Sequence, residues 1–223
     1  MTVLTNVFGT ENPALHALLL ETKMLAPEGY RLFAKIMQFL ARSKVPGDFV
    51  EVGCERGRTS CFLQEHILRL FPEKTLHVFD SFTGLPPEEP GERYNAPTKG
   101  MMSVPLSLFY ETFALCKLPL PHIHAGWFRD TLPVSLPSNI CFAFLDGDMM
   151  SSMRISLQEV IPRLADGGIC AIHDYRISPV WDEGVRRACD EYFRQELPMA
   201  DAMAIFQIRN GAVQPLPKEV ITV

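Results

Sequence analysis

The chain has 223 residues, of which 47% are hydrophobic and 21% charged, and these values of an ordinary globular protein exclude intrinsic disorder. Its net charge of -5 argues against nucleic acid as a partner, because duplex-binding proteins normally present a basic face. No apolar run reaches the roughly 18 residues that a membrane helix needs, and the first residues do not resemble a signal peptide. We therefore expect a cytoplasmic protein without a membrane partner.

The six cysteines are scattered through the chain, and none of them forms a CxxC pair. Cys141 and Cys170 lie inside apolar runs. Buried free thiols in a reducing compartment explain this usage better than a disulfide framework or a zinc cluster does.

The first 45 residues are predicted to be helical, because residues 14–22 and 31–41 carry apolar side chains at three- and four-residue spacing. Residues 23–30 contain Pro27 and Gly29 and are predicted to form a loop. We treat residues 1–45 as a helical segment that serves as a lid or an oligomer contact, most simply in a homodimer. Residues 46–223 then form the main domain.

Short apolar strands alternate with helices in the rest of the chain. We expect strands at 49–53, 76–80, 122–126, 140–145, 169–172 and 204–208, and helices at 59–70, 106–115, 156–164 and 185–193. The proline- and glycine-rich stretch 86–103 is predicted to be a long loop of the kind that forms lids. This alternation predicts an α/β fold with a mostly parallel sheet covered on both faces, whose ligand binds at the carboxyl ends of the strands.

The first two strands end in residues that suit a nucleoside. Gly53 and Gly57 form a Gly-x-x-x-Gly turn, which lacks the third glycine of a dinucleotide fingerprint and could be a purely structural turn. Asp80 ends the second strand and can accept hydrogen bonds from ribose hydroxyls, or it can cap the turn that follows it. Together they favour S-adenosylmethionine (SAM) over NAD as the ligand.

The fourth and fifth strands end in acidic and imidazole groups. Asp146-Gly147-Asp148 follows one strand and His173-Asp174-Tyr175 follows the other. Asp146 and Asp174 could hold one divalent cation such as Mg²⁺, Mn²⁺ or Ca²⁺, with His173 as a third ligand or a general base. The alternative is turn capping and a hydrogen-bonded loop. His122 and His124 share one face of their strand, where hydrogen-bonded packing is favoured over a zinc site.

With these residues in place, the chain resembles the TylF-type (macrocin/mycinamicin) SAM-dependent O-methyltransferases, which methylate sugar hydroxyls of natural products. The matching pieces follow the order of that family and comprise residues 47–53, 79–86, 125–133, 145–148 and 162–168, the last of which leads into 173–175. The resemblance implies a Rossmann-like class I methyltransferase fold with seven strands, so that residues 220–223 would supply the strand that the pattern does not reveal.

The resemblance also implies a role for each strand end. It assigns Glu51, Gly53 and Gly57 to the methionine end of SAM, Asp80 and Ser81 to the ribose, and Gly126, Trp127 and Phe128 to the adenine. Cys54 and Thr59 are further expected cofactor-binding residues. Trp127 could equally be part of the core. Asp146 and Asp174 match metal-binding carboxylates, but His173 stands where the family commonly has an aspartate. An imidazole favours softer ions such as Mn²⁺, Fe²⁺ or Zn²⁺, although Mg²⁺ remains the family's expectation.

We therefore expect an enzyme that transfers the SAM methyl group to a hydroxyl of a small molecule with help from a divalent cation. Asp146 and His173 would stand at the reacting hydroxyl. Two alternatives stay close to this hypothesis: a metal-independent methyltransferase with His173 as the base, and a SAM-binding homologue without activity. More distant alternatives are a glycosyltransferase that uses Asp146 and Asp148 as a DxD motif, and an NAD-dependent dehydrogenase.

Overall fold

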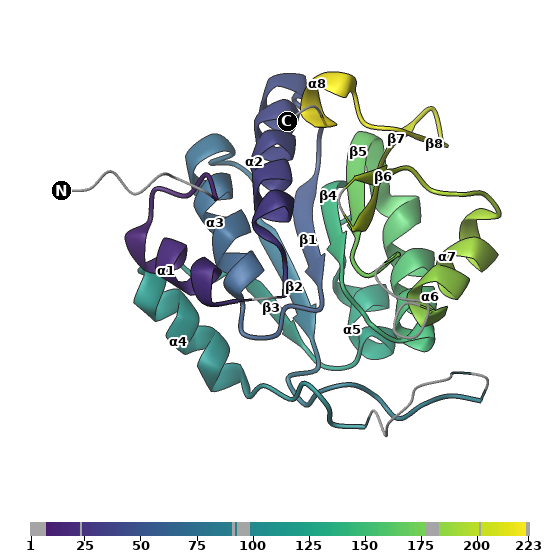
Figure 1. Ribbon diagram of the computed structural model, residues 1–223, viewed down its shortest axis with the longest axis horizontal. Helices are drawn as coiled ribbons and strands as arrows, with labels where there is room; N and C mark the ends of the chain where they lie inside the picture. The colour runs from purple at the N-terminus through teal and green to yellow at the C-terminus, as the bar shows by residue number, and fades with distance from the viewer. Residues whose placement is uncertain are drawn as a thin grey trace.

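The computed structural model describes residues 8–22, 24–90, 92, 99–176, 183–200 and 202–221 (Figure 1). Within these residues eight strands form one sheet, in the order β3-β2-β1-β4-β5-β7-β6 with β8 paired to β7. The strands are β1 Asp48–Val52, β2 Leu76–Asp80, β3 His122–Ala125, β4 Ile140–Leu145, β5 Leu164–Ile172, β6 Met199–Ala200, β7 Met203–Arg209 and β8 Ala212–Gln214. The helices are α1 Pro13–Glu21, α2 Pro27–Ser43, α3 Arg58–Leu70, α4 Leu106–Cys116, α5 Phe128–Ser135, α6 Met150–Val160, α7 Glu183–Phe193 and α8 Lys218–Ile221, and a 3₁₀ turn spans Ile161–Arg163.

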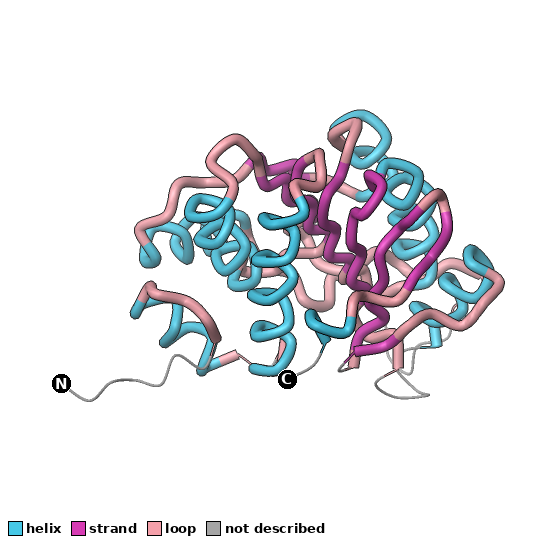
Figure 2. Tube along the Cα trace, turned by 90° about the horizontal axis from the view of Figure 1, so that it is seen from above, coloured by secondary structure: helices cyan, strands magenta, loops and turns pink. Residues whose placement is uncertain are grey.

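Helices cover both faces of this sheet. Strands β1 to β5 are parallel, whereas β7 runs antiparallel to β5. In Figure 1, α2, α3 and α4 lie on one side of the sheet and α5, α6 and α7 on the other, and Figure 2 shows the strands between these two helical layers. The α/β prediction with a mostly parallel sheet is therefore confirmed.

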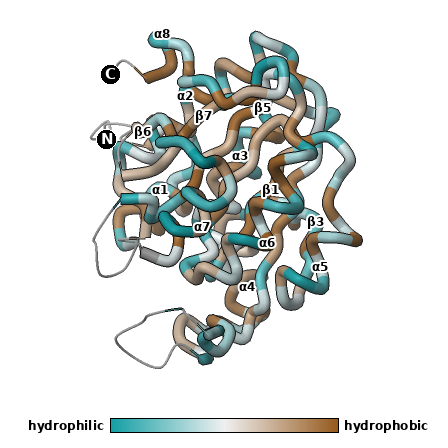
Figure 3. The backbone as a smooth tube through the Cα atoms, turned by 90° about the vertical axis from the view of Figure 1, so that its right-hand side faces the viewer, coloured by the Kyte–Doolittle hydropathy of each residue, from teal (hydrophilic) through white to brown (hydrophobic). Residues whose placement is uncertain are grey.

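The helix patterns bury one face each against the sheet. On α2, Tyr30, Phe33 and Met37 are spaced three and four residues apart and are all buried. The Phe33 ring lies 5.4 Å from the ring of Phe142 and 5.1 Å from that of Phe144, both on β4. Figure 3 shows the corresponding contrast, with teal stretches on the outer helix α7 and brown stretches along central strands.

Two predicted helix starts are wrong, and one helix was not predicted. Residues 23–30 are not a loop throughout, because α2 begins at Pro27, whose fixed φ suits the first helical position. Gly29 therefore lies inside the helix. The pattern also missed α5, which contains Pro133, and it began the next helix six residues later than α6 begins.

Two further corrections concern the C-terminal half. Strand β5 begins at Leu164, so Gly167 and Gly168 lie within a strand instead of ending a helix. Of the strand predicted at 220–223, residues 220 and 221 belong to the helix Lys218–Ile221, and the other two lie outside the described residues. The strands that the sequence pattern did not reveal are β6 and β8.

Other expectations about the whole chain have mixed outcomes. All six cysteines are buried and free, as predicted. Every helix in the described ranges is too short or too polar to cross a lipid bilayer. Part of the predicted loop at 86–103 lies outside the described residues, and the division of the chain at residue 45 stays a prediction.

Candidate functional site

A cavity of about 570 Å³ opens where β1, β2 and β4 end. Its lining includes eight of the ten residues predicted to bind the cofactor, namely Glu51, Gly53, Cys54, Thr59, Asp80, Ser81, Trp127 and Phe128. The other two, Gly57 and Gly126, are not part of the lining. Of the predicted metal ligands, Asp146 lines the cavity but His173 and Asp174 do not. Asp148 also lines it. The cavity therefore lies at the carboxyl ends of the parallel strands, where the sequence predicted the ligand site.

The glycines of the first turn have different structural reasons. Gly53 has φ +86°, and a Cβ atom there would lie 1.9 Å from the carbonyl oxygen of Asp146. Gly57 has φ +78°, and its Cβ would lie 2.6 Å from the Phe109 ring. Gly53 therefore keeps the neighbouring strand ends close, while Gly57 packs against α4 and precedes α3.

Glu51 is a fully buried carboxyl group in the cavity wall. One of its oxygens accepts a hydrogen bond from the Ser60 hydroxyl, and the other, Oε1, has no partner within the described part of the chain. Burial raises the pKa of Glu51 to about 8. The hydrogen bond from Ser60 opposes this shift, and the negative charges of Asp146 and Asp80 add to it. A buried oxygen without a partner is costly, so this atom is suited to a ligand that carries hydrogen-bond donors or positive charge.

Asp80 organises the turn around the cavity. Its Oδ2 accepts hydrogen bonds from the backbone N–H of Cys54 at 2.9 Å and of Glu55 at 3.0 Å. Its Oδ1 accepts a hydrogen bond from the Phe82 N–H at 2.8 Å. Asp80 therefore caps the turn that follows it, which was the alternative role given for it in the sequence analysis. Both lone pairs of Oδ2 are thus engaged, but Oδ1 has a second lone pair, so Asp80 can cap these turns and also accept a hydrogen bond from a ligand.

Trp127 is half-buried and lines the cavity, immediately before α5. This position does not favour the alternative that Trp127 belongs to the core. Phe128, the first residue of α5, lies in the same wall.

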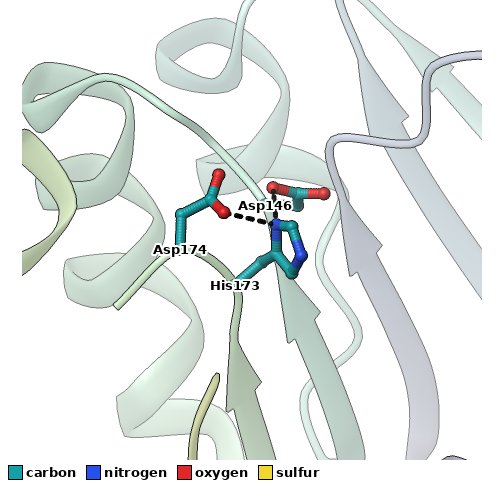
Figure 4. A group of neighbouring side chains, drawn as sticks. All are labelled: Asp146, His173 and Asp174. Carbon is teal, nitrogen blue, oxygen red and sulfur yellow. Dashed lines mark hydrogen bonds and ion pairs between the residues drawn. The ribbon is translucent and has the colours of Figure 1, made fainter. Parts of the chain in front are cut away.

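Asp146, His173 and Asp174 converge from the ends of β4 and β5 (Figure 4). The Nδ1 atom of His173 lies 3.2 Å from Oδ1 of Asp146 and 3.1 Å from Oδ1 of Asp174. Backbone hydrogen bonds fix this arrangement, from Asp146 N–H to the Val52 carbonyl and from His173 N–H to the Leu145 carbonyl. Asp148 does not belong to this group of three ligand atoms, which lie within 4.8 Å of one another.

The two carboxylates control the protonation of the imidazole. Burial alone would lower the pKa of His173, but Asp146 and Asp174 outweigh it and raise the pKa to about 11. Burial, followed by the charges of Asp146 and Asp174, raises the pKa of Asp148 to about 8. At neutral pH a protonated His173 therefore bridges the two carboxylates.

The same three residues also suit a divalent cation. Neighbouring ligands of an octahedral ion, each bound at about 2.1 Å, stand roughly 3 Å apart, close to the two separations around His173 Nδ1. A cation would displace the proton from that nitrogen, so metal binding and protonation compete.

The backbone at this site is unusual. Asp148 has φ 54° and Asp174 has φ 56°, both in the left-handed region that non-glycine residues rarely adopt. Aspartate tolerates this region better than most side chains do, and the fold holds both residues there beside the cavity and the ligand cluster.

Tyr30 is a cavity residue that the sequence did not reveal. It comes from α2, its ring is fully buried, and its hydroxyl lies 3.3 Å from the hydroxyl of Thr59. Burial raises the pKa of Tyr30 to about 12, although the hydrogen bond with Thr59 opposes this shift. The helical spacing of Tyr30 and Phe33 was the available signal, but Pro27 and Gly29 concealed it.

His122 and His124 do not line the cavity. His124 instead stacks on the Phe79 ring at 4.4 Å, and its Nε2 lies 3.1 Å from Nδ1 of His77. The prediction of packed, hydrogen-bonded histidines therefore holds for His124.

Comparisons with known proteins agree on one family. The family model described as Macrocin-O-methyltransferase (TylF) matches residues 19–209. The 8-demethyl-8-(2,3-dimethoxy-alpha-L-rhamnosyl)-tetracenomycin-C 4'-O-methyltransferase of Streptomyces olivaceus is 34% identical over 150 residues, which are 62% of this chain and 56% of that protein. The demethyldecarbamoylnovobiocin O-methyltransferase of Streptomyces niveus is 31% identical over 173 residues, which are 72% of this chain and 63% of that protein. The matched regions thus span only 56–63% of the length of these two relatives.

Solved structures share the fold. The O-methyltransferase NovP superimposes with a TM-score of 0.68 at 23% identity, covering 83% of this chain and 82% of its own. The calicheamicin methyltransferase CalS11 gives 0.64 at 19% identity, covering 86% and 89%.

Proposed function

Because this chain belongs to the macrocin O-methyltransferase (TylF) family, we propose that it transfers the methyl group of SAM to a hydroxyl group of a small molecule. The acceptor would be a sugar or another natural-product hydroxyl. The observation that carries this proposal is the single cavity wall that contains Glu51, Asp80 and Asp146 at neighbouring strand ends.

The cofactor half of the cavity has groups of the right charge for SAM. The free oxygen of Glu51 suits the cationic methionine end, and Asp80 suits the ribose hydroxyls. Trp127 and Phe128 offer aromatic surface to the adenine. Gly53 lets the residues after β1 and β4 approach each other in this wall, because a Cβ atom there would collide with the Asp146 carbonyl.

Methyl transfer needs an aligned acceptor that loses one proton. The sulfonium already activates the methyl group, so the protein mainly positions the reactants and receives the proton of the hydroxyl. Asp146, His173 and Asp174 would hold a divalent cation, which would lower the pKa of a bound hydroxyl. Mg²⁺ is the first candidate, and Mn²⁺ or another transition metal is the second because His173 is an imidazole ligand.

A metal-independent route is the second candidate. The hydrogen bonds of His173 to Asp146 and Asp174 favour it, since they give the cluster a stable arrangement without an ion. A base must be unprotonated, however, and the pKa of His173 near 11 keeps it protonated at neutral pH. In that route Asp146 is a better proton acceptor than His173, whose charge would instead orient the carboxylate.

Other parts of the proposal concern the setting of the enzyme. We place it in the cytoplasm, in keeping with its six free cysteines. We also propose a homodimer that acts on a small molecule and does not bind nucleic acid, in keeping with the net charge of -5.

Calorimetry with S-adenosylhomocysteine (SAH) tests the cofactor, and methyl transfer to a rhamnoside with EDTA and then Mg²⁺ or Mn²⁺ tests the metal. Asp146→Asn should abolish turnover, whereas Asp190→Asn, an exposed change on α7, should not. Failure to bind SAH would overturn the proposed function. Full activity in EDTA would overturn only the role of the metal, and the proposed methyl transfer would stand.

A further inference from the structure

The first turn of α6 forms part of the cavity wall just beyond Asp146 and Asp148. Met149, which precedes this helix, provides no side-chain cap. The cap comes instead from Glu92, whose Oε1 accepts a hydrogen bond from the Ser151 N–H at 2.6 Å. The other oxygen of Glu92 accepts from the Glu89 N–H at 2.7 Å. A carboxylate is stabilised at a helix N-terminus, so this contact fastens Glu92, and with it the backbone at Glu89, to α6.

The hydroxyl group of Ser151, which has no partner in the described residues, indicates that a ligand binds at the same place. Ser151 is only 8% exposed and lines the cavity, yet its Oγ atom has no hydrogen-bond partner among the residues that the structure describes. Ser156, one turn further along α6, donates its hydroxyl proton to the Ser152 carbonyl. A buried hydroxyl without a partner is uncommon, and in the wall of a binding cavity a bound molecule is its natural partner.

We propose that Ser151 is a specificity-determining residue that hydrogen-bonds a second hydroxyl of the acceptor, while the Glu92 contact closes the loop beside it. This inference rests on the proposed function, since it assumes that the acceptor occupies the half of the cavity beyond Asp146. The acceptor class is then a molecule with a free hydroxyl next to the methylated one, as in a sugar diol.

The occupied N-terminus of α6 favours an uncharged group at Ser151. The cavity lining as a whole carries both acidic side chains, such as Glu88 and Glu89, and basic ones, such as Lys99 and Arg129. The N-terminus of α6 would attract an anion, but it already binds the carboxylate of Glu92. A phosphate or carboxylate on the acceptor would have to displace the Glu92 carboxylate from this N-terminus, whereas a hydroxyl needs only the Oγ atom of Ser151.

The test uses SAH-loaded protein and methyl α-L-rhamnoside, with binding followed by NMR titration. Its 2-, 3- and 4-deoxy analogues each lack one hydroxyl. The wild type should bind one analogue about fivefold to tenfold more weakly than the parent, the loss expected for one hydrogen bond. Ser151→Ala should bind the parent and that analogue equally, and Ser151→Cys, which keeps the volume, should be intermediate. SAH affinity should stay unchanged in both variants.

Several results would overturn the inference. One is that each deoxy analogue loses as much affinity, relative to the parent rhamnoside, in Ser151→Ala as in the wild type. The serine hydroxyl would then have no partner on the sugar. Another is tighter binding of rhamnose 1-phosphate than of the methyl rhamnoside, which would contradict the uncharged class. Absence of rhamnoside binding to SAH-loaded wild type would also overturn it, whereas absence of SAH binding would overturn the proposed function instead.

Discussion

Replacing Glu51 by glutamine should stabilise the empty protein at alkaline pH and weaken its binding of SAM. The carboxyl group is fully buried, and burial raises its pKa from 4.5 to about 8. A carboxyl whose pKa is raised on folding binds its proton more tightly in the native state. Its contribution to stability is therefore complete below pH 4.5 and is lost as the pH rises towards 8.

The size of this loss follows from the shift. At 1.36 kcal/mol per pKa unit, ionising Glu51 in the native protein costs at most about 5 kcal/mol above pH 8. Glutamine stays neutral and can still accept the hydrogen bond from Ser60. We expect Glu51→Gln to match the wild type at pH 5 and to exceed its free energy of unfolding by a few kcal/mol at pH 9.

Urea unfolding at pH 5, 7 and 9 measures this difference. The matched control is Glu55→Gln, which removes a carboxylate from the same cavity wall where the side chain is 28% exposed and paired with Arg58. The control should not change the pH dependence of stability. SAH affinity, measured by calorimetry, should fall about tenfold in Glu51→Gln, because a charge-assisted hydrogen bond is lost. Identical pH dependence in Glu51→Gln and the wild type would refute the argument from burial.

Four other variants give direct tests. Gly53→Ala should lower the free energy of unfolding by about 3 kcal/mol or more and abolish SAH binding, because its Cβ would overlap the Asp146 carbonyl; thermal melts and calorimetry check this. Tyr30→Phe should change the free energy of unfolding by less than about 1 kcal/mol yet weaken SAH binding, as calorimetry would show, since Tyr30 lines the cavity and its hydroxyl contacts that of Thr59. His173→Asp should raise the affinity for Mg²⁺ relative to Mn²⁺ in metal titrations, because a carboxylate replaces the imidazole. Glu92→Ala should cost about 1 kcal/mol and speed proteolysis of the loop before α4, because α6 loses its cap.

The rule that ligands bind at the carboxyl ends of parallel strands made the strand-end residues of the site predictable. Asp80 ends an apolar strand, and Gly53, Asp146 and His173 each follow one, so parallel pairing brings all four to one edge of the sheet. His173 lies beside the cavity lining and is not part of it. Local periodicity and one topological rule were sufficient for these residues.

The remaining site residues depend on contacts that no local pattern encodes. Tyr30 reaches the cavity because α2 packs on β4, which is a tertiary contact. Glu92 and Ser151 are 59 residues apart, and only the path of the loop brings them together. Gly167 and Gly168 suggested the end of a helix, but they lie within β5, which pairs with β4 on both sides of these glycines.

The left-handed backbone of Asp148 and Asp174 has a consequence for how this sequence can change. Glycine or asparagine would adopt those dihedral angles at lower cost. At Asp148 asparagine would also relieve the crowding of negative charge beside Asp146 and Asp174, whereas at Asp174 it would remove the partner of His173. A screen that selects only for heat resistance should therefore drift towards a neutral side chain at Asp148. The proteins that survive such a screen would be more stable but would lack a carboxyl group that lines the cavity, and only a concurrent selection for the function of the cavity would keep Asp148.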